Sequence, residues 1–150
     1  MSDIIKDKNK NHRIMEKIIV NVSWCNKNYG ASFSENVPGA AVFTAKTFEE
    51  LQREAQETLD FHMQGYIEDG EAPQWYLDHN YEFEYNFLDA ATLLHIYSPD
   101  LTLSAISRAT GINQTQLSHY ANGVKTPRPA QRQRIIDGLH AIGRRLMAAR

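Results

Sequence analysis

The sequence is poor in cysteine, in long apolar runs and, over most of its length, in basic residues. Its single cysteine, Cys25, excludes an internal disulfide framework and is typical of a protein of the reducing cytoplasm. No apolar run approaches the roughly 18 residues that span a bilayer, and the N-terminus lacks the hydrophobic core of a signal peptide. These absences exclude a disulfide-rich secreted protein, and they predict a cytoplasmic protein with no membrane partner.

Charge is divided unevenly along the 150 residues. Residues 15–100 hold 4 Lys and Arg against 15 Asp and Glu, a net charge of −11, whereas residues 101–150 hold 8 against 1, a net charge of +7. A basic segment attracts the phosphate backbone of nucleic acids, and an acidic segment is repelled by it. The acidic part therefore either binds a different, basic partner or is acidic only for solubility. Two small domains explain this division better than one large domain.

The basic third of the chain contains the most informative stretch, LTLSAISRATGINQTQLSHYANGVKTPR at 101–128. Thr102 and Asn113 can each cap a short helix through a side-chain oxygen. Gly111 lies between the two helices and can adopt the left-handed backbone conformation of a tight turn. Two short helices joined by such a turn are a candidate DNA-reading unit.

The second of these helices, expected from Gln114 to about Asn122, has an apolar inward face and a polar, uncharged outward face. Short amides and hydroxyls suit hydrogen bonding to base edges in the major groove, whereas a merely solvated helix more often carries Glu and Lys. The predicted base contacts are Gln114, Thr115, Gln116, Ser118 and His119. Basic residues that follow are candidate phosphate contacts: Lys125, Arg128, Arg132 and Arg134. A plain helical hairpin is the alternative interpretation of this stretch.

The spacing of these residues carries a family resemblance. Ser107, a small residue, lies four positions before Gly111, and apolar Leu117 lies six positions after it. This spacing, with the N-G-x-K-x-P ending at 122–127, resembles the helix-turn-helix of the lambda-repressor-like (XRE) family. The resemblance implies that Gln114, Thr115 and His119 touch bases, while Asn122 and Lys125 touch phosphates. Leu103 departs from the family pattern, which often places a polar phosphate-binding residue there.

Residues 15–88 predict an α+β domain with the order β-β-β-α-β. Period-two alternation of apolar residues predicts strands at 17–24, 29–33 and 81–87, and a short strand with bulky Val42 and Phe43 is expected at 40–45, after a turn. Thr47 and Glu50 form a capping box, in which each side chain satisfies the backbone donor of the other residue, at the start of a long helix. Gly70 and Pro73 then mark a loop. One face of the long helix is expected to pack on the sheet: Phe48, Leu51, Ala55, Leu59, Met63, Tyr66 and Ile67.

The two ends of the chain differ from this central domain. Residues 1–14 are polar, lysine-rich and aperiodic, and they predict a disordered leader. Residues 89–150 predict an all-α domain, in which Asp89 caps the first helix. Its last helix, beyond Pro129, is expected both to pack in the domain and to support a homodimer or higher homo-oligomer. The apolar stripe of that helix comprises Ile135, Ile136, Leu139, Ile142 and Leu146.

A second resemblance covers about residues 15–148. Three antiparallel strands, the turn at Pro38-Gly39, the threonine-capped T-F-E-E-L helix at 47–51 and a further strand resemble the N-terminal domain of HicB antitoxins. In that family a partial RNase-H-like fold precedes a DNA-binding domain. The resemblance implies that the N-terminal domain blocks a small basic toxin RNase, HicA. It also implies that the antitoxin represses its own operon by binding operator DNA.

Candidate sites in the acidic domain are less specific. The expected toxin contacts are Trp75, Tyr76, Glu82 and Glu84, with core packing and a solvated strand edge as alternatives. The carboxylates do not converge in sequence, the six histidines lack metal-ligand spacing, and Cys25 is expected to be buried as a small hydrophobe. We therefore expect no catalysis, no metal and no cofactor. The alternatives to an antitoxin are a stand-alone repressor with a ligand-sensing N-terminal domain and a metal-dependent nuclease.

Overall fold

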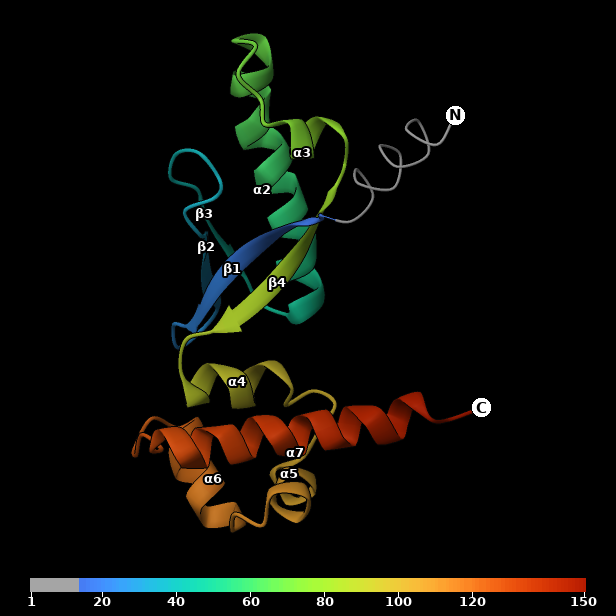
Figure 1. Cartoon of the computed structure of the whole chain (residues 1–150). Coiled ribbons are helices and arrows are strands. Elements are labelled where there is room, and N and C mark those ends of the chain that lie inside the picture. Colours follow the sequence, from blue (N-terminus) through green and yellow to red (C-terminus); the bar gives the residue numbers. More distant parts are fainter. Residues whose placement is uncertain (1–13) are drawn as a thin grey trace. The chain divides into compact units, whose positions relative to one another are not determined.

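The computed structural model describes residues 14–150 (Figure 1). Apart from Ile14, the predicted leader at 1–14 lies outside the described residues. The chain divides into two compact units between Asn86 and Phe87, two residues before the predicted boundary. The first unit combines a four-stranded sheet with helices, and the second is built from helices, so the fold class is α+β. None of the helices within residues 14–150 has the length and apolar character needed to cross a bilayer.

The sheet of the first unit has the strand order β3-β2-β1-β4. The hairpin β1-β2 pairs Trp24 with Tyr29, and β3 continues the sheet in the antiparallel sense. Strand β4 lies beside β1 and runs in the same direction, so the sheet is mixed (Figure 1). Two contacts fix this register at opposite ends of the pair: Glu16 with Asn80, and Asn21 with Asn86. The strands are β1 (Glu16–Trp24), β2 (Tyr29–Phe33), β3 (Val42–Ala45) and β4 (Tyr81–Phe87).

Helix α2 (Phe48–Glu68) packs its apolar stripe against one face of this sheet. Every second residue of β1 points into the resulting core, as the alternation predicts. Each Val, Leu, Ile or Met side chain that is fully buried in this way stabilises the fold by about 1.5–3 kcal/mol. The fully buried members are Ile18, Val20, Val22, Leu51, Ala55, Leu59 and Met63. The prediction is confirmed for Tyr66, which packs against the core, and is wrong for Ile67, which is 47% exposed.

The start of α2 differs from the predicted capping box. Thr47 caps the helix as expected, since its hydroxyl accepts a hydrogen bond from the backbone nitrogen of Glu50 at 3.1 Å. The Glu50 carboxylate accepts instead from the backbone nitrogen of Lys46, at 3.2 Å, one residue before the predicted donor. The side chain thus satisfies an orphan donor just outside the helix.

The segment predicted as a loop after Gly70 contains a short helix, α3 (Gln74–Leu77), so the order of the first unit is β-β-β-α-α-β. Pro73 fixes its own φ at −60° and precedes the helix, a position where the missing N–H costs nothing. Trp75 and Tyr76 pack against the hydrophobic core and thereby hold the turn in helical form. Pro73, which is expected from the sequence to mark a loop, therefore marks the beginning of a helix.

Cys25 also departs from expectation, because it is exposed. Strand β1 ends at Trp24, and Cys25 begins the tight turn to β2, in which Asn26 has a φ of 68°. The turn directs the thiol toward the backbone oxygen of Ser23, at 3.6 Å, and away from the core. The alternation of β1 stops one residue before the cysteine.

The second unit is a helical bundle whose core is continuous through its described helices. They are α4 (Ala90–Ile96), α5 (Leu103–Thr110), α6 (Gln114–Ala121) and α7 (Pro129–Met147). Asp89 caps α4 as predicted, accepting from the backbone nitrogen of Thr92 at 2.7 Å. The fully buried side chains include Leu94, Ile106, Leu117 and Ile135. The predicted stripe of α7 ends at Ile142, because Leu146 is 68% exposed.

Candidate nucleic-acid interface

Helices α5 and α6 are joined by a three-residue turn whose geometry is fixed by hydrogen bonds. Gly111 ends α5 with φ 74°, in the left-handed region that favours glycine. Asn113 caps α6, and its side-chain oxygen accepts from the backbone nitrogen of Gln116 at 2.8 Å. Ser107 on α5 donates its hydroxyl to the carbonyl of Ile112 at 2.6 Å, which ties the turn back to the first helix. These bonds hold α6 in one orientation relative to α5.

Close packing also holds α5 and α6 in place. A Cβ atom added to Gly138 of α7 would lie 2.5 Å from Cγ2 of Thr110 and 3.4 Å from the backbone of Ala109. Helix α7 therefore packs closely on α5, and a side chain at position 138 would overlap the Thr110 methyl group. On α6, Leu117 is fully buried and Tyr120 is 5% exposed, which turns the opposite side of that helix outward.

Four of the five predicted base-contact residues line one shallow hollow on this outward side. They are Gln114, Thr115, Ser118 and His119, joined by Leu103 of α5. Gln114 and Thr115 are exposed, whereas Ser118 and His119 are half-buried. No Asp, Glu, Lys or Arg lines the hollow. The surface therefore offers neutral donors and acceptors beside one apolar side chain.

The imidazole of His119 is oriented in this hollow. Its Nδ1 is buried and has no hydrogen-bond partner within the described part of the chain. A neutral imidazole carries one donor and one acceptor nitrogen, so His119 adds to the hollow a group that can hydrogen-bond in either sense.

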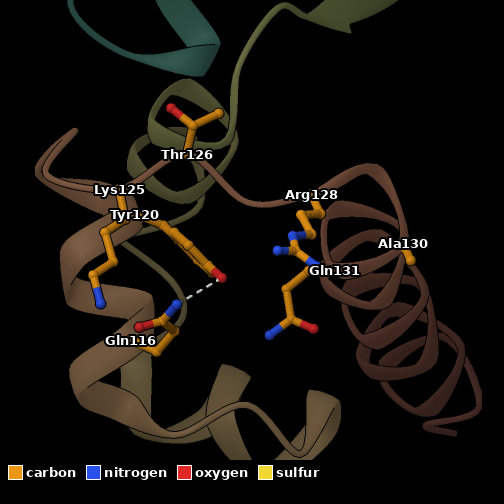
Figure 2. Close-up of a pocket in the computed structure, with 7 residues that line it drawn as sticks. All are labelled: Gln116, Tyr120, Lys125, Thr126, Arg128, Ala130 and Gln131. Carbon is orange, nitrogen blue, oxygen red and sulfur yellow. Dashed lines mark hydrogen bonds between the residues drawn. The ribbon is translucent and has the colours of Figure 1, made fainter.

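The fifth predicted base contact, Gln116, lies in a second hollow between α6 and the start of α7 (Figure 2). Its side-chain nitrogen donates to the Tyr120 hydroxyl at 2.8 Å. Lys125 and Arg128, both predicted phosphate contacts, reach the same hollow from the connecting segment. The remaining lining residues, which the sequence pattern did not single out, are Thr126, Ala130 and Gln131.

The start of α7 adds unpaired backbone donors to this second hollow. Arg128 is the N-cap residue, Pro129 is the first helical residue, and no side chain caps the helix. The backbone N–H groups of Ala130 and Gln131 therefore lie in the first turn, where helices leave donors without an intrahelical partner. Such donors and the positive end of the helix dipole favour an anion. The Pro129 that begins α7 was the available sequence signal for this feature.

The other predicted phosphate contacts are placed differently. Arg132 is half-buried and donates from its guanidinium to the backbone carbonyl of Phe87. Arg134 donates to the Thr110 carbonyl at 2.9 Å, next to the turn at Gly111. Asn122 is exposed, and its amide contacts the Ser118 hydroxyl at 3.4 Å. Asn122, Lys125 and Arg128 thus remain available on the surface, whereas Arg132 is engaged within its own unit.

The candidate toxin contacts of the first unit are not brought together. Trp75 and Tyr76 are half-buried and contact Tyr81, with ring centroids 5.6 Å and 5.9 Å from its ring. Glu82 and Glu84 lie on the opposite face of β4 from the core. The Glu84 carboxylate lies 4.0 Å from the Lys17 ammonium. The four residues therefore do not form one surface.

The described residues, 14–150, contain no cluster of three or more His, Cys, Asp or Glu side chains that could hold a metal ion. Comparisons with protein-family models, with curated proteins and with solved structures find no match to this chain. The site must therefore be interpreted from its own chemistry.

Proposed function

We propose that this protein is an antitoxin that represses transcription, with DNA binding in the second unit and toxin binding in the first. The observation that carries the proposal is the hollow on α6, where neutral polar side chains are held outward on a rigid helix pair. The sequence resemblances to the XRE helix-turn-helix and to HicB antitoxins support the same assignment. In this interpretation α6 is the recognition helix.

The side chains of the α6 hollow match the chemistry of the major groove. Gln114 presents an amide that can bond adenine in a bidentate manner, and Thr115 presents a hydroxyl and a methyl group. The His119 imidazole can hydrogen-bond to a polar group of a base edge, such as purine N7. Leu103 offers apolar contact to a thymine methyl group. Each well-formed contact of this kind discriminates between bases by about 1–3 kcal/mol.

The second hollow suits the phosphate backbone. Lys125 and Arg128 supply positive charge, and the start of α7 supplies backbone donors and the helix dipole. Residues 87–150 carry 8 Lys and Arg against 3 Asp and Glu, a net charge of +5, so the unit attracts DNA as a whole. Phosphate contacts at this hollow would set the register in which α6 meets the bases.

Recognition of an operator implies a homodimer. Two recognition helices about 34 Å apart meet successive major grooves on one side of a duplex. The exposed apolar residues at the end of α7, Leu146 and Met147, are candidates for this contact, since they are 68% and 80% exposed in the single chain.

The first unit has the charge for a basic partner. Residues 14–86 carry 13 Asp and Glu against 4 Lys and Arg, a net charge of −9, so this unit is repelled by DNA. A small basic RNase is the partner that the HicB resemblance implies. Binding would mask the toxin until the antitoxin is removed.

Selection of duplexes from a random pool with the full-length protein tests the DNA half of the proposal. We expect a palindromic site whose selection depends on Gln114 and His119. Co-expression with a small basic RNase of the HicA type tests the other half, with cell growth as the measurement. Recovery of no preferred sequence, or growth arrest despite folded antitoxin, contradicts the corresponding half.

A further inference from the structure

Phe61 lies on the outward face of α2 and is 79% exposed. The buried residues Leu59 and Met63 each lie two positions away, so at 3.6 residues per turn they project roughly 160° from Phe61. No ring contact involves Phe61 within the described part of the chain. An aromatic ring in water on the polar side of an amphipathic helix has no role in packing this unit.

Gly65 follows Phe61 by four residues, on the same side of the helix. A Cβ atom placed there would meet nothing within 4 Å, so no packing in the described chain requires a glycine. Glycine in the interior of a helix costs about 1 kcal/mol relative to alanine. Its effect is a bare stretch of helix backbone beside the Phe61 ring.

Carboxylates surround the ring and the bare stretch. Glu54, Glu57 and Glu68 lie seven before, four before and seven after Phe61, which places them along the same stripe. Within residues 14–150 the ion pair found joins Lys17 to Glu84, so these three have no cationic partner there. Helix α2 holds six acidic residues and one basic residue, Arg53. These carboxylates form a rim around Phe61 and Gly65 that carries a strong negative charge.

We propose that Phe61, Gly65 and the carboxylates of Glu54, Glu57 and Glu68 form the docking surface for the basic partner, here named the Phe61 surface. This inference rests on the antitoxin function proposed above and names the site of that interaction. A lysine or arginine of the partner would lay its stem across the Phe61 ring and its charge among the carboxylates. The bare backbone at Gly65 would admit the partner's adjoining side chain.

Charge complementarity selects this occupant over others. Duplex DNA is repelled by the rim, and a second copy of the first unit would bring like charges together. A basic protein is attracted by the rim, and an aromatic anchor framed by charged residues is typical of a binding hot spot. The residues predicted from sequence, Trp75 and Tyr76, pack against the core and are less available.

Titration of the full-length protein with a small basic RNase of the HicA type, inactivated by replacement of its catalytic histidine, tests the Phe61 surface. We expect Phe61→Ser to weaken binding about 30-fold. The double variant Glu57→Lys, Glu68→Lys should slow association and weaken its dependence on salt. Val42→Ser is the matched control, since Val42 is also apolar and 78% exposed but lies on β3.

The outcomes separate the two proposals. If the wild-type protein does not bind the basic protein, the antitoxin function itself is wrong. If the wild-type protein binds and Phe61→Ser binds equally well, only the Phe61 surface is wrong. A change in the oligomeric state of Phe61→Ser, with toxin affinity unchanged, would instead assign the surface to a second copy and overturn the proposal.

Discussion

The guanidinium of Arg132, on α7, donates a hydrogen bond to the backbone carbonyl of Phe87, the last residue of β4 and the first of the second unit. The Nε of the same side chain is buried and has no partner within the described residues. An arginine held in this way ties α7 to the beginning of its unit, 45 residues earlier in the chain. The bond gives Arg132 a structural role within its own unit, beside the phosphate contact that the sequence predicts.

We expect Arg132→Ala to lower the free energy of unfolding by about 1–3 kcal/mol, since a hydrogen bond to a charged donor is lost. The salt dependence of DNA binding should not change. Arg128→Ala is the matched variant, for which stability should change by less than about 0.5 kcal/mol while the slope of log affinity against log salt falls by about 1. Urea denaturation and binding titrations at several salt concentrations measure both quantities. If Arg132→Ala instead lowered the salt dependence of DNA binding and left stability unchanged, Arg132 would be a phosphate contact.

The proposed reading face on α6 makes a separate prediction. Gln114→Ala and His119→Ala should each reduce the preference for the selected operator over random DNA by about 1–3 kcal/mol, because each removes a proposed base contact. Affinity for random duplex should stay the same, since phosphate contacts are kept. Competition titrations with both duplexes measure the ratio. Gln133→Ala, on α7 and exposed, is the control, and an equal loss there would contradict the assignment.

Much of this arrangement was predictable because it depends on local chemistry. Thr102, Gly111 and Asn113 act through bonds to residues within a few positions, so their roles can be inferred from the sequence alone. The same holds for the alternation of β1 and for the cap at Asp89. The period of apolar residues and the capping of a helix each depend on residues within one segment of the chain.

The features that sequence could not predict depend on distant segments. Arg132 meets Phe87 across 45 residues, and Gly138 meets Thr110 across 28. Nothing near Arg132 in the sequence indicates that its partner is the Phe87 carbonyl. Similarly, exposure of Phe61 follows from where the sheet lies, because hydrophobicity alone does not say which apolar residues have a neighbour.

The contact of Gly138 with Thr110 gives a stability prediction with an internal control. Gly143→Ala should stabilise the protein by about 0.5–1 kcal/mol, since its Cβ meets nothing and alanine favours helix. Gly138→Ala should destabilise it by about 1–3 kcal/mol, because the new Cβ overlaps Thr110 Cγ2. Thermal or urea unfolding measures both.

Thr110 cannot easily turn away from such a clash, because its hydroxyl donates to the Ile106 carbonyl at 2.8 Å. The double variant Gly138→Ala, Thr110→Ser removes the methyl group and keeps the hydroxyl. It should recover most of the lost stability. If Gly138→Ala were as stabilising as Gly143→Ala, α5 and α7 would not be in contact at this point.

Tyr76 belongs to a hydrogen-bonded network in the first unit. Its hydroxyl donates to the Asp60 carboxylate at 2.7 Å, and the side-chain nitrogen of Gln56 donates to the same carboxylate at 3.0 Å. Gln56 also donates to the Tyr81 hydroxyl at 2.7 Å. Burial, followed by the hydrogen bond and the negative charge of Asp60, raises the pKa of Tyr76 to about 12.

The raised pKa of Tyr76 fixes how stability depends on alkaline pH. The unfolded chain loses this proton near pH 10 and the folded protein near pH 12, so the stabilisation is complete below about pH 10 and is lost as pH rises through 12. Tyrosinate absorbance should show that Tyr76→Phe removes one group titrating near pH 12. Asp60→Asn should lower the pKa of Tyr76, because the carboxylate charge is gone while an amide oxygen can still accept the hydrogen bond. An unchanged absorbance titration in both variants would assign the late-titrating group to another of the tyrosines whose pKa is raised by burial: Tyr29, Tyr85 or Tyr97.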